Sequence, residues 1–237
     1  MNQGPESYED WEFSKDSGKI KIKEKSWTFD HLLDHTDDQE ITYEKVAKQT
    51  ITDFTHGFNG TIFAYGQSGS GKTFSMLGPD DVTDALKKDF KNIPDKVQEL
   101  YGITPRAVIQ IFEAINLFVS QGSSCSLTCS YIEIYNETIN CLLSKKENLK
   151  IREVPGVGMH VADKDERLCK IPEEIFQTIS LASKNRAVCA TDMNSRSSRS
   201  HTILMIEMEY HGIDGVKRNS RLNLVDLAGS ERVKIFK

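Results

Sequence analysis

The chain has 237 residues, which is enough for one large domain or two small ones. Its net charge is −5, and its hydrophobic content of 38% is too high for a disordered protein. The chain has no run close to the roughly 18 apolar residues of a membrane span, its polar start is unlike a signal peptide, and its acidic balance argues against general nucleic-acid binding. We therefore expect neither a membrane nor a nucleic acid as a partner.

The start of the chain predicts a polar segment over 1–25, in which isoleucines alternate with lysines over 19–23 as in a short exposed strand. Apolar residues at helical spacing then predict a helix that contains 43–54. Asp37 and Glu40 are spaced as a capping box for the start of this helix.

The rest of the chain predicts alternating strands and helices. Strand formers over 61–65 end in a glycine-rich turn, and the charged stretch 78–103 is typical of a surface insertion with a short helix. Thr104 and Pro105 begin one predicted helix and Pro172 begins another. Further strands are predicted over 127–135, 203–210 and 222–227. This order predicts an α/β protein with a mostly parallel central sheet and helices on both faces. After the polar segment we expect one domain over 26–237.

The strongest functional signal is a glycine-rich sequence that lies between a predicted strand and a predicted helix. It fits the pattern G-x-x-x-x-G-K-[ST] of a phosphate-binding loop and consists of Gly66, Gln67, Ser68, Gly69, Ser70, Gly71, Lys72 and Thr73. Glycines let backbone N–H groups turn toward phosphates, and the following helix adds a positive potential. We therefore predict that Lys72 contacts the β- and γ-phosphates and that the Thr73 hydroxyl binds Mg²⁺. A glycine-rich hairpin with an unrelated lysine is the alternative.

Two later segments fit the same kind of site. Residues 194–201 are dense in hydroxyl and guanidinium groups, although by themselves they are equally typical of a solvated loop. The apolar strand over 222–225 ends at Asp226, where P-loop proteins place the acidic residue that faces Mg²⁺. Gly229, three residues further on, can present its N–H to a γ-phosphate.

Taken together and in this order, these segments resemble the signature sequences of the kinesin motor domain. So do residues 60–67, which run into the phosphate loop, and residues 130–137; the resemblance extends from about Trp27 to Arg232. It implies a P-loop NTPase fold, ATP and Mg²⁺ as cofactors, ATP hydrolysis coupled to movement on microtubules, and a place in the cytoplasm on the microtubule cytoskeleton.

The resemblance also implies residue roles on the phosphate side of the site. Ser197 and Ser198 would sense the γ-phosphate, and Ser198 would join Thr73 at the metal. Asp226 would hold the metal through a water, and Gly229 would sense the γ-phosphate through its backbone N–H.

Three further roles follow from the same resemblance. Kinesins sense the nucleotide with two switch segments, which correspond here to residues 194–201 and 226–231. Arg199 and Glu231 would form an ion pair that closes these two segments over the attacking water. Phe74 would pack on the adenine. Catalysis would come mainly from positioning and from charge stabilisation by Lys72, the metal and the N–H of Gly229.

The chain departs from the kinesin pattern at both ends. Nothing before Trp27 resembles the usual first strand with its Arg-x-Arg-Pro segment, and the sequence stops six residues after Glu231. We therefore expect a partial motor domain that is truncated at its C-terminus, binds nucleotide and does not move along microtubules alone. A dimer would form through segments of a full-length protein that lie outside this stretch.

Residues 141–171 are similar to the part of kinesins that touches the microtubule, and they contain the basic residues Lys145, Lys146, Lys150 and Arg152. An ordinary solvated charge cluster explains these residues equally well. The competing function is a non-catalytic kinesin-like adaptor or microtubule-binding fragment. A signalling GTPase is disfavoured because the sequence lacks an Asn/Thr-Lys-x-Asp segment.

Overall fold

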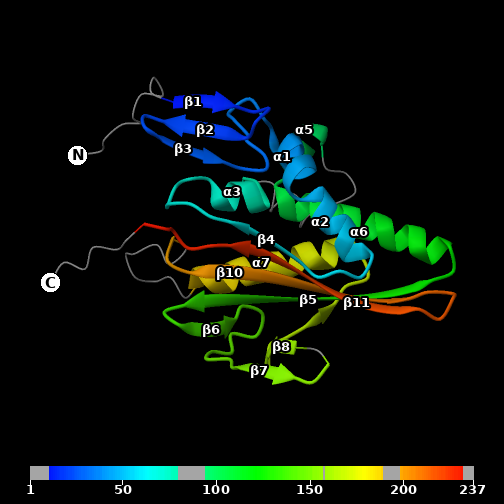
Figure 1. The fold of residues 1–237 in the computed structure, drawn as a ribbon. Helices are drawn as coiled ribbons and strands as arrows, with labels where there is room; N and C mark the ends of the chain where they lie inside the picture. The colour runs from blue at the N-terminus through cyan, green and yellow to red at the C-terminus, as the bar shows by residue number, and fades with distance from the viewer. Residues whose placement is uncertain (1–10, 80–93, 157, 189–197, 232–237) are drawn as a thin grey trace.

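The structure is a computed structural model and describes residues 11–79, 94–156, 158–188 and 198–231 (Figure 1). Its described strands form a three-stranded sheet near the N-terminus, a central six-stranded sheet and a two-stranded hairpin. The strands are β1 (Trp11–Ser14), β2 (Lys19–Ile22), β3 (Lys25–Thr28), β4 (Gly60–Ala64), β5 (Ser124–Tyr135), β6 (Thr138–Cys141), β7 (Ile151–Val154), β8 (Gly158–Val161), β9 (Arg167–Leu168), β10 (His201–His211) and β11 (Lys217–Asp226). The helices are α1 (Gln39–Val46), α2 (Lys48–Thr55), α3 (Lys72–Leu77), α5 (Asp95–Gln98), α6 (Ile103–Ser120) and α7 (Pro172–Val188).

The central sheet has the strand order β4–β11–β10–β5–β6, and β9 also pairs with β5. Only β4 and β11 are parallel; the other described pairs of this sheet are antiparallel. The predicted α/β class is confirmed, but the expectation of a mostly parallel sheet is wrong, because the sheet is mixed. β10 and β11, like β5 and β6, are consecutive strands joined by short turns, and a short turn can connect only antiparallel neighbours.

Alternate residues of the central strands face the helices and form the core. On β10, Leu204, Ile206 and Met208 are buried together with Phe54 of α2 and Phe176 of α7. This period of two places the same-parity residues of each strand on one face. We call it the helix-covered face, because α2, α3, α6 and α7 pack on it (Figure 1).

The opposite face of the sheet is different from what the sequence predicts. Helices were expected on both faces, but within the described residues this face carries the β7–β8 hairpin, where Arg221 of β11 donates from Nη1 to the carbonyl of Met159 at 3.2 Å. The strand residues on this face are correspondingly polar at that end, as at Thr128 and Glu207.

The described part of the polar N-terminal segment contributes β1 and β2 to the small antiparallel sheet β1–β2–β3, and the strand predicted over 19–23 is β2. The domain boundary expected between residues 25 and 26 lies inside β3. Lys15 ties this sheet to the loop before α1, since its ammonium lies 3.0 Å from Asp34 and 2.8 Å from Asp37. Hydrogen bonds from the hydroxyl and N–H of Thr36, and then from Lys15, hold the pKa of the Asp34 carboxyl below its usual range. Lys15 and the N–H of Asp34 lower the pKa of the Asp37 carboxyl.

The helix predicted around 43–54 is present as two helices, α1 and α2, which meet at Ala47. The predicted capping residue is also corrected. Asp38, not Asp37, caps α1 by accepting from the N–H of Ile41 at 2.8 Å. Asp37 instead pairs with Lys15 and accepts from the N–H of Asp34.

The two ends of the surface insertion predicted over 78–103 lie next to each other in space. Its described part contains the short helix α5, and residues 80–93 lie outside the described residues. Gly78 and Gly102 meet at its base, since a Cβ on Gly102 would lie 2.7 Å from the backbone nitrogen of Gly78. The chain therefore leaves α3 and returns to α6 at nearly the same place.

Of the described helices, none combines the length and the apolar character needed to cross a membrane.

The position of the α1 cap gives a stability test. Asp38→Ala removes the acceptor for the N–H of Ile41, so we expect the free energy of unfolding to fall by about 1 kcal/mol, measured by urea denaturation. Glu40→Gln is the matched control, because no contact of Glu40 with the cap is found among the described residues. An equal loss in both variants would contradict this assignment of the cap.

Candidate nucleotide-binding site

The glycine-rich loop 66–71 lies between the end of β4 and the start of α3, as the sequence predicts. Gly69 and Gly71 have φ values of +77° and +91°, which side chains with a Cβ rarely adopt. The Lys72 ammonium folds back over this loop and donates to the carbonyls of Gly66 at 3.0 Å and Gln67 at 2.8 Å. The loop is therefore a compact turn with the ammonium held directly against it.

The predicted metal residues come together at the ends of two neighbouring strands. Thr73 Oγ1 donates to Asp226 Oδ2 at 2.5 Å, and Asp226 lies opposite Ala64 in the parallel pair β4–β11. Asp226 Oδ1 is buried and has no hydrogen-bond partner among the described residues. A hydroxyl beside a carboxylate oxygen that lacks a partner fits Mg²⁺, which prefers oxygen ligands and keeps several waters.

The chemistry of the donor set limits the kind of metal site that is possible. The described residues contain no group of three His, Cys, Asp or Glu that could hold a metal ion. A cation at Thr73 and Asp226 would thus complete its shell with waters and with a ligand such as phosphate.

The segment that follows β11 lies against both the glycine-rich loop and the end of the first switch segment, residues 194–201. The N–H of Gly229 donates to the carbonyl of Ser198 at 2.8 Å, and the N–H of Ser230 donates to the carbonyl of Gly66 at 3.0 Å. The N–H of Ala228 donates to Nδ1 of His201 at 3.0 Å. The second switch segment, residues 226–231, is therefore held between the other two parts of the site.

Glu231 contacts the glycine-rich loop rather than Arg199. Its carboxylate accepts from the N–H of Ser68 at 2.8 Å and from the Ser68 hydroxyl. These hydrogen bonds, the hydroxyl first, lower the pKa of the Glu231 carboxyl below its ordinary value. Arg199 is exposed, and within the described residues no ion pair joins it to Glu231. The Arg199–Glu231 bridge stays a prediction.

The structure does not test the predicted roles of two other residues, Ser197 and Phe74. Ser197 lies outside the described residues. The Phe74 side chain is 48% exposed, so its ring is accessible, and its role at an adenine stays a prediction.

One residue that supports the site was not found from the sequence. Gln39, the first residue of α1, is buried and donates from Nε2 to the carbonyl of Phe74 at 2.9 Å. It holds the helix that begins with Lys72. Its partner lies 35 residues further along the chain, so no local pattern marks it.

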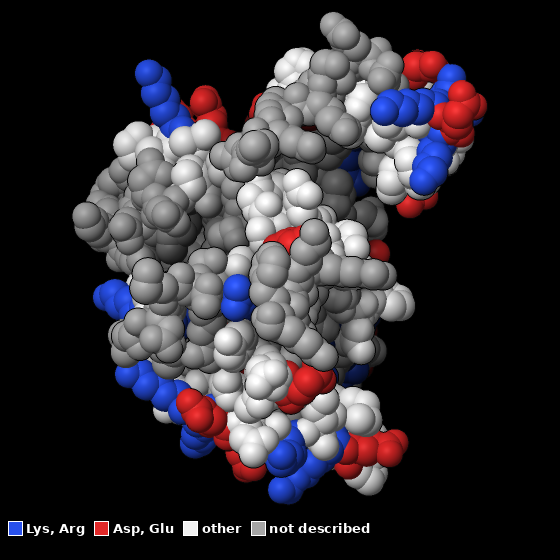
Figure 2. Space-filling view, turned by 90° about the vertical axis from the view of Figure 1, so that its left-hand side faces the viewer, with Lys and Arg blue, Asp and Glu red and all other residues white. Residues whose placement is uncertain are grey.

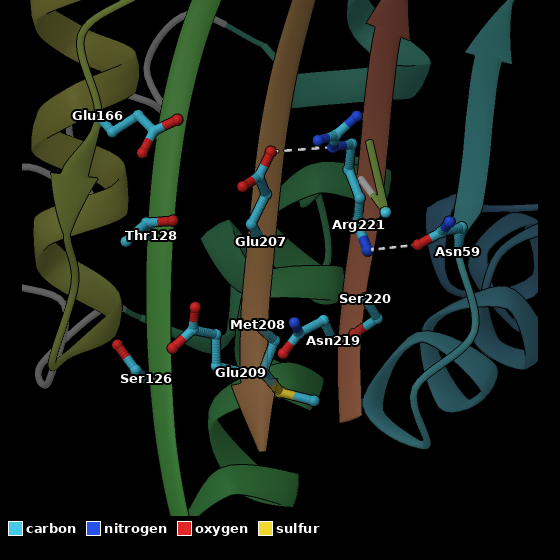
Figure 3. Close-up of a pocket in the computed structure, with 11 residues that line it drawn as sticks. Asn59, Ser126, Thr128, Glu166, Glu207, Met208, Glu209, Asn219, Ser220 and Arg221 are labelled. Atoms are coloured by element: carbon cyan, nitrogen blue, oxygen red, sulfur yellow. Dashed lines mark hydrogen bonds and ion pairs between the residues drawn. The ribbon is translucent and has the colours of Figure 1, made fainter. Parts of the chain in front are cut away.

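A pocket lies on the opposite face of the sheet, away from the glycine-rich loop. Its volume is about 510 Å³, and it is lined by strands β5, β10 and β11 (Figure 3). Glu166, Glu207 and Glu209 give it a negative lining, and its cation Arg221 is already paired with Glu207 at 2.8 Å. Such a lining repels polyphosphates, so this pocket does not compete with the loop as a nucleotide site.

The fold and the site define a P-loop NTPase of kinesin type. The solved structure titled "Structure of a fast kinesin: Implications for ATPase mechanism and interactions with microtubules" matches with a TM-score of 0.81 and 31% identity, over 96% of this chain and 62% of that one. Residues 3–236 match the family model for the kinesin motor domain. The chain belongs to the kinesin family of microtubule motor proteins.

Curated relatives agree with this family. The chain is 41% identical over 220 residues to Kinesin-related protein 5 of Dictyostelium discoideum, over 92% of this chain and 21% of that protein. It is 40% identical over 218 residues to Kinesin-like protein KIF15 of Homo sapiens, over 89% of this chain and 15% of that protein. The chain thus spans about a fifth or less of the length of these relatives.

The contact between Ser68 and Glu231 gives a pH test. A carboxyl whose folded-state pKa is lowered keeps its contact above the ordinary pKa and loses it as the pH falls through the lowered value. We expect Glu231 to titrate below an ordinary glutamate in ¹³C NMR of the carboxyl groups, and Ser68→Ala to raise its pKa. Ser70→Ala is the control and should leave the Glu231 pKa unchanged; no effect of Ser68→Ala would contradict the contact.

Proposed function

We propose that this chain binds ATP with Mg²⁺ at the glycine-rich loop and hydrolyses it, and that the full-length protein couples this reaction to movement along microtubules. The observation that carries the proposal is the direct contact between Thr73 and Asp226. It brings the phosphate loop and the acidic end of β11 to one point, as binding of a nucleotide with its metal requires.

The contacts of Lys72 suit phosphate binding. Its ammonium donates to two neutral carbonyls, Gly66 and Gln67, which are weaker acceptors than a charged phosphate oxygen. Phosphates would therefore draw the ammonium away from the loop at little cost. The bound Mg²⁺, held by Thr73 and through a water by Asp226, would neutralise phosphate charge.

The switch contacts suit a response to the γ-phosphate. The N–H of Gly229 donates to the carbonyl of Ser198, and a γ-phosphate oxygen would replace that carbonyl as the acceptor. Glu231 would likewise leave Ser68 and pair with Arg199. In both cases one hydrogen-bond partner would be exchanged for another when the γ-phosphate binds. Such exchanges give nucleotide switches two discrete conformations, one with and one without the γ-phosphate.

The microtubule contact that we propose within the described residues is the basic cluster on and before β7. Lys145 and Arg152 are exposed, Lys146 is paired with Asp165 at 2.9 Å, and Lys150 donates to Asn148. Figure 2 shows Lys and Arg side chains mixed with Asp and Glu at the bottom of the view, the part to which β6 to β8 belong. A mixed surface of this kind gives weak, salt-sensitive attraction to an acidic polymer. A place on the microtubule cytoskeleton and a dimer formed elsewhere in the full-length protein belong to the same proposal.

Two substitutions test the nucleotide site. Lys72→Ala should abolish binding of a fluorescent ATP analogue, because the loop amides alone do not offset the phosphate charges. Thr73→Ala should weaken mainly the Mg²⁺ dependence of that binding. Lys96→Ala, at an exposed lysine of α5, is the control. Unchanged affinity in Lys72→Ala would overturn the nucleotide site, whereas binding without hydrolysis in the wild-type chain would favour the non-catalytic adaptor.

A charge reversal tests the microtubule contact. Lys145→Glu combined with Arg152→Glu should reduce co-sedimentation with microtubules at low salt, and wild-type binding should fade at physiological ionic strength, where screening acts within about 8 Å. The control reverses two lysines of the N-terminal sheet, Lys19 and Lys25. Salt-resistant pelleting, or equal losses in both variants, would contradict a contact at this cluster.

A further inference from the structure

An ion pair with a fully buried carboxylate and a partly buried guanidinium lies next to Ser200, in the described end of the first switch segment. Glu133 of β5 is 1% exposed, and its Oε1 lies 3.4 Å from Nε of Arg186 in the last turn of α7. Neither residue belongs to the phosphate loop or to the predicted switch contacts. A carboxylate in the core of the sheet is costly unless a cation balances it, and Arg186 supplies that cation.

The same guanidinium also holds the end of the first switch segment. Arg186 Nη2 donates to the Ser200 hydroxyl at 2.9 Å and to the Ser200 carbonyl at 3.4 Å. Ser200 is fully buried and directly follows Ser198 and Arg199. One side chain therefore joins the end of α7, the central strand β5 and the start of β10.

The neighbouring residue strengthens this anchorage. Asn185 is buried and donates from Nδ2 to the carbonyl of Leu142 at 2.6 Å, just after β6. The last turn of α7 is thus fixed at two points, by Asn185 to the edge of the sheet and by Arg186 to its centre.

The register of the sheet connects this pair with the metal residue. Glu133 lies opposite Thr202 of β10, and Thr202 lies opposite Asp226 of β11. All three side chains belong to the helix-covered face. Glu133 and Asp226 are two strand spacings apart, which is about 10 Å. An unbalanced Glu133 would add a second buried negative charge near the place where the phosphates would lie.

We propose that Arg186 is a positioning residue for the first switch segment. Its guanidinium neutralises Glu133 and fixes Ser200, and so it presents Ser198 and Arg199 to the γ-phosphate. The inference rests on the proposed nucleotide function and deepens it, because it assigns γ-phosphate discrimination to a side chain that does not touch the nucleotide. Arginine suits this role because its planar fork binds two partners at once, which a lysine ammonium does not do with the same geometry.

A merely structural role predicts a different result, and two variants of the 237-residue chain separate the possibilities. Glu133→Met combined with Arg186→Met removes both charges at similar volume, a replacement that often leaves stability unchanged or improved. Arg186→Lys keeps the positive charge opposite Glu133 but loses the hydrogen bonds from the guanidinium to Ser200. Arg186→Met alone leaves Glu133 unbalanced, and we expect it to lower Tm by about 10 °C.

The experiment measures Tm and the dissociation constants for Mg-ADP and for a non-hydrolysable Mg-ATP analogue. In the double variant and in Arg186→Lys we expect a wild-type-like Tm and unchanged ADP binding. Affinity for the ATP analogue should fall about tenfold, the loss of about one hydrogen bond to a charged group. The control is the same double replacement at the exposed pair Glu44–Lys48, which should change neither constant.

The outcomes separate the two levels of inference. Wild-type affinity for both nucleotides in folded Arg186→Lys and in the folded double variant would overturn the positioning role and leave the nucleotide site intact. An equal loss of both nucleotides would also overturn it, because it indicates general distortion. Failure of the wild-type chain to bind either nucleotide would overturn the proposed function, and this inference with it.

Discussion

The hydrogen bond between Thr73 and Asp226 is the contact on which the site depends. It exists because β4 and β11 are parallel neighbours, so that the chain leaves both strands at the same edge of the sheet. The parallel pairing is in turn supported by α2, whose Phe54 carbonyl accepts from the buried Ser220 hydroxyl of β11 at 2.8 Å. A shift of β11 by one residue would turn Asp226 away from Thr73 and Ser220 away from Phe54 together.

The parts of the site that the sequence predicts are those set by local chemistry. Positive φ at Gly69 and Gly71 is a property of single residues, and Lys72 and Thr73 follow these glycines directly. The apolar strand that ends at Asp226 is also a local pattern. Most helices and strands are confirmed for the same reason, since periodicity and propensity are read within one segment.

The parts that the sequence does not predict depend on distant partners. Asp37 and Asp38 are both plausible caps, and only the ammonium of Lys15 decides that Asp37 is used elsewhere. Strand direction was predicted from the alternation of elements, yet the short turn between β10 and β11 makes that pair antiparallel. Glu231 meets Ser68 across 163 residues, so no spacing in the sequence indicates the contact.

Glu133 and Arg186 show why such distant contacts matter for function. In sequence, Glu133 is one acidic residue in an apolar strand and Arg186 is one basic residue at a helix end. The antiparallel register places Glu133, Thr202 and Asp226 in one row, and α7 brings Arg186 to the end of that row. A sheet resists a change of register far more than a loop resists displacement. The row therefore holds Asp226 and the turn at Ser200 in one fixed arrangement. Under the proposed function, binding or loss of a phosphate would therefore change the side-chain and turn contacts around this row, and the strands would not need to move.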